Sequence, residues 1–278
     1  MEEIDVPVRG GRLRVLDWPG DGPVVIAAHG ITANALSWAA VARALAGRVR
    51  LIAPDLRGRA LSASLPGPFG MAAHAADLIA VADHFGVARP ALAGHSMGGF
   101  VVTETAARYP DRAGPVLLID GGLPLPTPPG IDVDTALTAT IGPAMRRLSM
   151  TFPTAGDYLA FFRSNPALAR SWNQDISNYV LRDYTGTGSS CNIDAVRADA
   201  RDMLTAPAPA GYPILGAPRG LQDEETGMYP AATLAAAGAE MVPGVNHYTI
   251  LLGDGATHVA DRIATMATPR ASPGARPG

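Results

Sequence analysis

Short apolar runs alternate along the chain with segments in which apolar residues recur at helical spacing. Four runs are continuously apolar, as expected for strands covered by helices on both faces of a sheet: residues 24–28, 51–53, 90–93 and 116–119. The segments with a helical pattern are residues 35–46, 71–85 and 100–109. Residues 6–9 and 13–16, joined through Gly10-Gly11, predict an antiparallel hairpin at the sheet edge. The pattern as a whole predicts an α/β fold with a doubly wound, mostly parallel sheet.

The alternation stops after the sixth predicted strand, residues 116–119, and resumes with strands at 213–218 and 239–242. Two proline-rich stretches, 123–130 and 206–213, border the interruption, and the sequence between them has helical character. Residues 124–210 are therefore predicted to form a helical cap inserted into a core of residues 1–123 and 211–268. Residues 269–278, rich in Pro, Gly, Ala and Ser, are predicted to be disordered.

Two helix starts are predicted inside the cap. Thr154 followed by Asp157 matches a capping box, in which a hydroxyl accepts a hydrogen bond from a free N–H of the first helical turn. Ser171 precedes an amphipathic stretch and is predicted to cap a second helix in the same way.

The segment Gly94-His95-Ser96-Met97-Gly98 joins a predicted strand to a predicted helix. Glycines on either side of the serine remove the side chains that would clash in so tight a bend, and the hydroxyl is pushed out of the backbone. A plain Gly-Ser-Gly surface turn is the alternative, but it explains neither the flanking strand nor the helix. The pattern therefore indicates a nucleophilic serine at a strand-to-helix turn.

The chain resembles the α/β-hydrolases from Val24 to about Met266. The resemblance rests on this turn and on His29-Gly30, Asp55-Leu56-Arg57-Gly58 and Asn246-His247, which follow one another in the family's order. Ala60 departs from the family pattern, since a second glycine usually stands there. This departure concerns the conformation of one turn and not the fold.

The resemblance implies a triad in the chain order serine, acid, histidine. Ser96 is the expected nucleophile and His247 the expected general base. Asp223, three residues after Gly220, has the usual spacing for the acid and is preferred. Asp120, directly after the strand 116–119, is the alternative acid.

The resemblance also implies an oxyanion hole formed by the backbone N–H groups of Ile31 and Met97. Caps in this position cover the nucleophile in α/β-hydrolases and shape the substrate pocket. Large side chains near the expected site are candidates to line the pocket: Trp38, Met97, Phe152, Trp172 and Tyr248. The alternative is that the cap aromatics only hold the cap together.

Composition narrows the range of partners. The 278 residues carry a formal net charge of -3 without a block of like charge, which argues against a nucleic-acid partner or a polybasic membrane patch and favours a small-molecule substrate. The acidic N-terminus does not resemble a signal peptide, and no apolar run reaches the roughly 18 residues of a membrane span, so a cytoplasmic location is expected. All 22 basic residues are arginine, which favours a high-GC bacterium as the source. The sequence does not indicate an oligomeric state.

These observations predict a serine hydrolase that cleaves a small or medium apolar carboxylic ester, thioester or lactone through an acyl-enzyme. Such chemistry needs neither a metal nor an organic cofactor. Serine at the turn argues against epoxide hydrolase and haloalkane dehalogenase activity, since those members of the family use aspartate there. Two alternatives stay open: a triad-bearing biosynthetic enzyme, such as a cyclase or C–C hydrolase, and a ligand receptor with little turnover.

Overall fold

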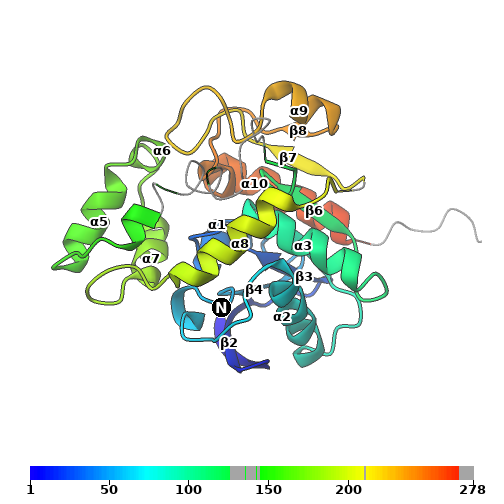
Figure 1. The fold of residues 1–278 in the computed structure, drawn as a ribbon. Coiled ribbons are helices and arrows are strands. Elements are labelled where there is room, and N and C mark those ends of the chain that lie inside the picture. The colour runs from blue at the N-terminus through cyan, green and yellow to red at the C-terminus, as the bar shows by residue number, and fades with distance from the viewer. Residues whose placement is uncertain (126–134, 136–141, 143–144, 210, 269–278) are drawn as a thin grey trace, which may run out of the picture.

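The computed structural model describes residues 1–125, 135, 142, 145–209 and 211–268, and its described strands form one mixed sheet of eight strands (Figure 1). The strands are β1 (Glu2–Val8), β2 (Gly11–Trp18), β3 (Val24–Ala28), β4 (Arg50–Pro54), β5 (Ala91–His95), β6 (Val116–Ile119), β7 (Ile214–Gly216) and β8 (Glu240–Met241). Their order is β1-β2-β4-β3-β5-β6-β7-β8, in which β2 pairs antiparallel with both β1 and β4 and all the other neighbouring strands pair parallel. The predicted hairpin and doubly wound sheet are confirmed.

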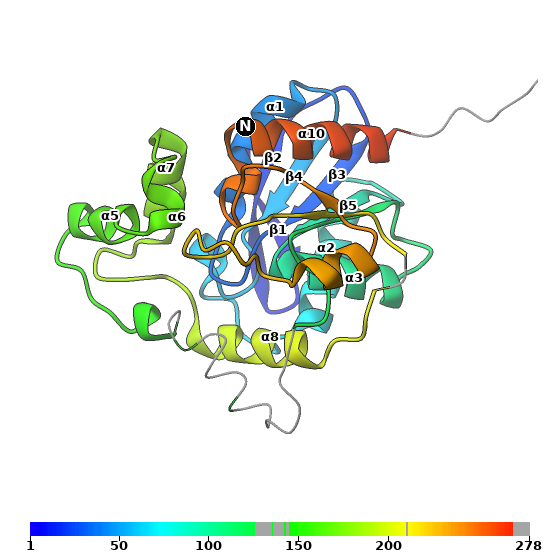
Figure 2. The ribbon, with the colours of Figure 1, turned by 90° about the horizontal axis from the view of Figure 1, so that it is seen from above.

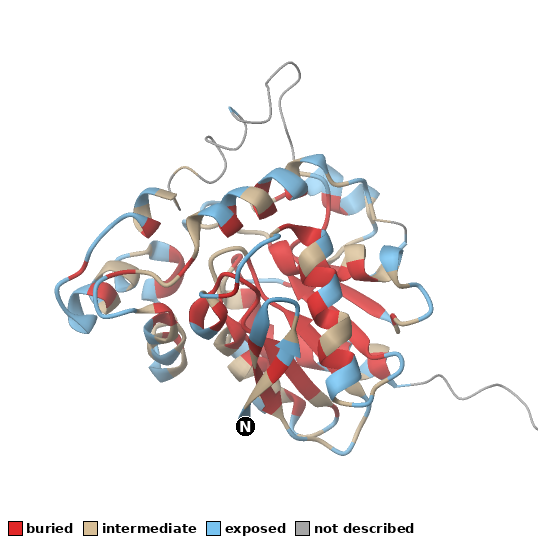
Figure 3. Ribbon diagram, turned by 60° about the horizontal axis from the view of Figure 1, so that its bottom comes forward, coloured by how far each residue is buried: buried red, intermediate tan, exposed pale blue. Residues whose placement is uncertain are grey.

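Helices cover both faces of the sheet, so each central strand is buried on both sides (Figure 3). On one face lie α1 (Ala39–Leu45) and α10 (Gly253–Ala267), and on the other lie α2 (Met71–His84) and α3 (Met97–Arg108) (Figure 2). Each face has its own apolar core. This double burial explains why the central strands are continuously apolar rather than alternating.

The described helices of the insertion follow β6 and precede β7: α5 (Ala155–Arg163), α6 (Pro166–Ala169), α7 (Gln174–Asp183) and α8 (Ile193–Thr205). Helices α5, α6 and α7 form a lobe beside the sheet, while α8 runs across α2 and α3 (Figures 1 and 2). A helical insertion after the sixth strand was predicted and is confirmed. Its predicted start near residue 124 adjoins residues outside the described part, and the predicted disordered tail, 269–278, lies outside it as well.

The predicted helix starts in the cap have different outcomes. Thr154 caps α5, and its hydroxyl accepts a hydrogen bond from Asp157 N–H at 3.1 Å. Ser171 does not cap α7. That role belongs to Asn173, whose side chain accepts from Ile176 N–H at 3.1 Å, because the helix begins two residues later than predicted.

The remaining elements are short. The predicted helix at residues 35–46 begins as a 3-10 turn, η1 (Ala35–Trp38), before it becomes α1. The other short elements are η2 (Ala60–Ser62), α9 (Ala231–Ala236) and η3 (Thr249–Leu251). Among the described helices, none combines the length and apolar character that a bilayer span requires.

Candidate active site

Ser96 stands between the end of β5 and the start of α3, in a backbone conformation with φ 55° and ψ −121°. A positive φ is strained for a side chain of this kind and persists only where the surroundings impose it. The glycines around it allow the chain to close on itself. A Cβ on Gly94 would lie 2.2 Å from the carbonyl oxygen of Gly98, and one on Gly98 would lie 2.0 Å from that of Ala28. Larger residues cannot occupy these positions, which explains the G-x-S-x-G spacing.

The turn after β6 packs against the serine turn backbone to backbone. A Cβ on Gly121 would lie 2.1 Å from the carbonyl oxygen of Ser96 and 2.5 Å from its Cα. Asp120 directly precedes this glycine and is itself in a left-handed conformation, with φ 43°. The position of Asp120 relative to Ser96 is therefore set by the main chain.

Asp120 contacts His247. The Oδ2 atom of Asp120 lies 2.6 Å from Nδ1 of His247, and both residues are buried. The Oδ1 atom of Asp120 accepts a hydrogen bond from Ala217 N–H at 3.1 Å. A carboxylate that accepts from Nδ1 keeps the proton on that nitrogen and leaves Nε2 free to act as a base.

The preferred acid, Asp223, has no hydrogen bond to His247 among the described contacts, and the alternative, Asp120, makes that contact instead. Asp223 Oδ1 accepts instead from Asn246 Nδ2 at 3.0 Å, and Arg219 Nε lies 3.5 Å from the same oxygen. These two partners hold the carboxylate beside the histidine turn. Asn246 itself also donates to the carbonyl of Ala167 in the cap at 3.0 Å, so Asp223 supports the residue before His247.

The two residues expected to form an oxyanion hole lie beside the serine. Ile31 follows β3 in the turn that begins with His29-Gly30, and it lines the same pocket as Ser96. A Cβ on Gly30 would lie 3.6 Å from the Oγ of Ser96, so this turn passes close to the hydroxyl. Met97 is the first residue of α3, where backbone N–H groups have no partner within the helix.

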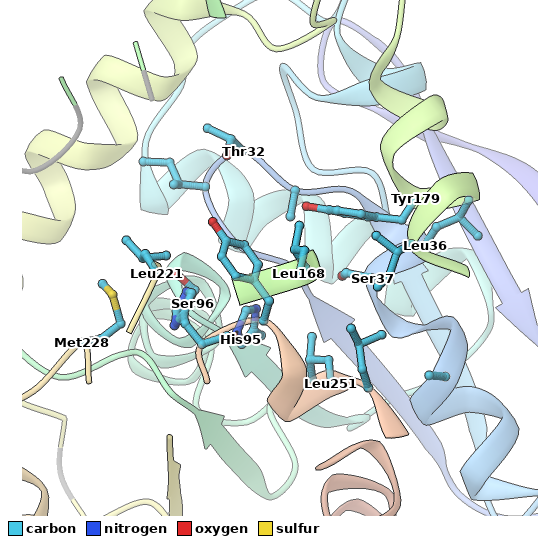
Figure 4. Close-up of a pocket in the computed structure, with 18 of the residues that line it drawn as sticks. Thr32, Leu36, Ser37, His95, Ser96, Leu168, Tyr179, Leu221, Met228 and Leu251 are labelled. Carbon is cyan, nitrogen blue, oxygen red and sulfur yellow. The ribbon is translucent and has the colours of Figure 1, made fainter. Parts of the chain in front are cut away.

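A pocket of about 180 Å³ opens beside Ser96 between the core and the cap (Figure 4). Ser96 and His247 both line it. The core contributes Leu36 and the cap contributes Ile176 and Tyr179, and most of the remaining lining is apolar as well. An apolar cavity of about 150 Å³ is large enough to bind benzene, so this pocket suits a small ligand or part of a larger one.

Of the four aromatic residues proposed for the pocket, Tyr248 lines it and three do not. Trp38 is fully buried in the apolar core that also contains residues of α1, and Leu36 and Ser37 of the same 3-10 turn line the pocket instead. Phe152 and Trp172 pack inside the cap. The alternative interpretation, that these cap aromatics hold the cap together, applies to both.

His95 is a lining residue that the sequence analysis did not single out. Its Nε2 donates to the backbone carbonyl of His247 at 2.9 Å, and the two rings lie 4.7 Å apart. Burial, together with the nearby His247, lowers the pKa of His95 to about 3. A neutral ring therefore supports the histidine turn without placing a second positive charge beside it.

Within the described residues, no cluster of three or more His, Cys, Asp or Glu side chains is arranged to hold a metal ion. Asp175 is the one carboxylate among the described lining residues, and it pairs with Arg43 across the boundary between cap and core, with Nη1 to Oδ1 at 3.0 Å. None of the described lining residues is an arginine.

Curated relatives match part of the chain. An uncharacterized protein of Mycobacterium tuberculosis is 34% identical over 115 residues, which cover 40% of this chain and 33% of that protein. The magnesium-chelatase 30 kDa subunit of Rhodobacter capsulatus is 35% identical over 106 residues, which cover 36% of this chain and 37% of that protein. The matches thus span little more than a third of these relatives' lengths.

Solved structures match almost the whole chain. The hydrolase of E-2-(acetamidomethylene)succinate superposes with a TM-score of 0.73 at 23% identity, covering 95% of this chain and 98% of that one. An esterase from Thermogutta terrifontis gives 0.64 at 20% identity, covering 96% and 100%. At such identities the likeness shows the fold alone. A family model described as alpha/beta hydrolase fold matches residues 23–184, more than half of the 278 residues. The chain therefore belongs to the α/β hydrolase fold family.

Proposed function

We propose that the protein is a serine hydrolase with Ser96 as nucleophile, His247 as general base and Asp120 as the acid that orients it. The observation that carries the proposal is the 2.6 Å contact between Asp120 and His247 Nδ1 in a buried site that also holds Ser96. A buried carboxylate needs a partner, and this one has both the imidazole and a backbone N–H.

In the proposed reaction, His247 Nε2 takes the proton of Ser96 as the hydroxyl oxygen attacks the carbonyl carbon of the substrate. The N–H groups of Ile31 and Met97 hold the oxyanion of the tetrahedral intermediate, a contribution of about 3 to 4 kcal/mol for one such donor. His247 then returns the proton to the leaving group, and an acyl-enzyme forms. Water, activated by His247, attacks the ester carbonyl, and the acid is released with Ser96 restored.

The pocket favours a neutral acyl group as the substrate. Its described lining is mainly aliphatic and aromatic and contains no arginine to pair with a substrate carboxylate. A small or medium apolar carboxylic ester fits this lining, and a thioester or lactone of the same size fits it equally. The protein is accordingly proposed as a carboxylic ester hydrolase.

A fluorophosphonate probe and a series of p-nitrophenyl esters of increasing acyl length test the proposal. The wild-type protein is expected to be labelled once, at Ser96, and to hydrolyse the shorter esters fastest. Ser96→Ala should lose both the labelling and the turnover, while Ser164→Ala, at an exposed serine after α5, should keep both. Hydrolysis by Ser96→Ala at the wild-type rate would refute the nucleophile, and a wild-type protein without labelling or turnover would favour a ligand receptor.

A further inference from the structure

A buried arginine lies directly behind the two proposed oxyanion donors. Arg59 follows β4 in the turn before η2, and its side chain is fully buried. Its Nε donates to the backbone carbonyl of Ile31 at 2.9 Å. A terminal nitrogen of the same guanidinium lies 3.7 Å from the sulfur of Met97. One side chain therefore contacts both residues whose N–H groups are assigned to the oxyanion hole.

The charge of Arg59 is balanced from the cap. Asp199, on α8, places its Oδ2 2.5 Å from Nη1 of Arg59, and this carboxylate is fully buried too. Asp199 also accepts from Gly70 N–H at 2.8 Å and contacts His74 Nε2 at 3.0 Å. Burial by itself would raise the pKa of Asp199, but the adjacent Arg59 guanidinium and the contact with His74 outweigh it and lower the pKa. Asp199 is thus an ionised partner that binds a different nitrogen of the guanidinium from the one that donates to Ile31.

The planar shape of the guanidinium suits this task. Its nitrogens point in fixed directions, so Arg59 reaches Ile31, Asp199 and the carbonyl of Arg57 at 2.9 Å at the same time. A lysine ammonium carries the same charge but is a single point on a flexible stem. The bond to the Ile31 carbonyl anchors this residue from its carboxyl side and so limits the movement of its N–H. An oxyanion donor must be held in place before the reaction, because it stabilises the transition state most when it does not have to reorganise as the charge develops.

We propose that Arg59 is a positioning residue for the oxyanion hole, and that Asp199 of the cap helix α8 holds Arg59 in the required orientation. The inference rests on the proposed serine hydrolase function and concerns the transition state only. An interaction with the oxyanion is stronger in the transition state than in the ground state, so its disturbance lowers kcat and leaves KM nearly unchanged.

The test compares Arg59→Lys with Arg57→Lys. Arg57 is a matched control because it is equally buried in the same turn and binds Asp77 through two hydrogen bonds of 2.7 and 2.9 Å. The side chain of Arg57 donates to Asp77 and to the carbonyl of Pro66, away from the oxyanion turn. Arg57→Lys loses the bidentate pair with Asp77, and Arg59→Lys loses the simultaneous contacts of one guanidinium with Ile31, Arg57 and Asp199. Both variants keep a buried positive charge without its full set of partners, so both should have a lower thermal unfolding midpoint.

Arg59→Lys is expected to lower kcat by about 10- to 100-fold with KM within about threefold of wild type, less than the 100- to 1000-fold effect of removing a donor. A trifluoromethyl ketone, which forms an oxyanion on addition of the serine, should bind more weakly by about the same factor. Arg57→Lys should keep kcat and ketone affinity within about threefold of wild type. A purely structural role for Arg59 predicts equal effects of the two substitutions.

The proposal is overturned if Arg59→Lys matches Arg57→Lys in kcat and in ketone affinity. If Arg59→Lys does not fold, the double variant Arg59→Gln/Asp199→Asn removes both buried charges together, and wild-type kcat in that protein would equally overturn the proposal. Failure of the proposed function has a different signature: the wild-type protein itself would then resist the fluorophosphonate and leave the esters intact. A labelled, active wild type with an unaffected Arg59→Lys refutes only the role of Arg59.

Discussion

Replacing Asp120 with asparagine should abolish most of the turnover while leaving the fold in place. The surroundings of Asp120 determine how an asparagine would sit there. Oδ1 accepts from Ala217 N–H, a donor, so the amide oxygen of asparagine would keep that bond. The amide NH2 would then point at His247 Nδ1, which lies 2.6 Å from Oδ2 in the native protein.

This orientation reverses the tautomer of the histidine. An NH2 group facing Nδ1 makes Nδ1 an acceptor, so the ring proton moves to Nε2, where it prevents the ring from taking the proton of Ser96. In serine proteases the same substitution costs about 10⁴-fold in kcat. At about 1.36 kcal/mol for each factor of ten, this corresponds to about 5.4 kcal/mol of barrier. The left-handed backbone at Asp120, with φ 43°, is tolerated by asparagine, so little strain is added.

The assay measures kcat and KM for one activated ester with Asp120→Asn and with Asp223→Asn as the matched control. Asp223 also has a positive φ, 64°, and its amide oxygen can still accept from Asn246 Nδ2. Asp223→Asn should therefore retain turnover within about threefold. Circular dichroism and thermal unfolding establish that both variants are folded. If Asp223→Asn collapses and Asp120→Asn stays active, the assignment of the acid to Asp120 is refuted.

Three further predictions concern stability and specificity. Ala46 is exposed and left-handed, with φ 49°, at the end of α1, so Ala46→Gly should raise the free energy of unfolding by up to about 1 kcal/mol. Ala44→Gly, inside the helix, should lower it by about 1 kcal/mol. Urea unfolding measures both changes. Burial lowers the pKa of His29 from 6.5 to about 3, so between pH 6.5 and 3 the unfolded chain binds a proton at this residue that the folded chain does not. The free energy of unfolding therefore decreases as the pH falls through this range, by up to about 1.4 kcal/mol per pH unit for His29. His29→Gln should make this pH dependence less steep, and an unchanged slope would contradict the prediction. Ile176→Ala should lower the free energy of unfolding by about 2 to 5 kcal/mol and shift the preferred ester to an acyl chain about two to three carbons longer. If the ratio of kcat/KM values for long and short esters does not change, Ile176 does not limit the length of the pocket.

The fold and the serine turn could be predicted because their signals are local. A continuously apolar run indicates burial on both faces of a strand, and the two glycines around Ser96 indicate main-chain packing so close that an added Cβ would lie about 2 Å from a carbonyl oxygen. Ala60 shows that such signals are not absolute, since it adopts φ 43° where glycine is usual and the turn still forms.

The carboxylate that contacts His247 and the residues that line the pocket could not be predicted from the sequence as well as the fold and the serine turn. Asp120 and Asp223 both follow strands at the active edge, and the sequence does not show that Asp120 contacts His247 whereas Asp223 contacts Asn246 and Arg219. Trp38 was a pocket candidate as a large side chain near the expected site, but it is buried in the core, and Leu36 and Ser37 of the same 3-10 turn line the pocket.

No pattern in the sequence predicts the contact between Arg59 and Asp199. Its members lie far apart in the chain, and each looks there like an ordinary surface charge. Only the packing of α8 over the core brings the two side chains together in the interior. Charged residues that meet through tertiary structure give no periodic signal, so the structure was needed to find them.

The backbone contact between Gly121 and Ser96 has a consequence for how this protein can change over time. Main-chain packing, rather than the lining of the pocket, sets where Ser96 stands relative to Asp120. Mutations in Leu36, Ile176 or Tyr179 can therefore accumulate without disturbing that spacing. The proposed catalytic residues and these three lining residues are therefore separate positions, and a library confined to Leu36, Ile176 and Tyr179 should yield new acyl preferences at little loss of basal turnover.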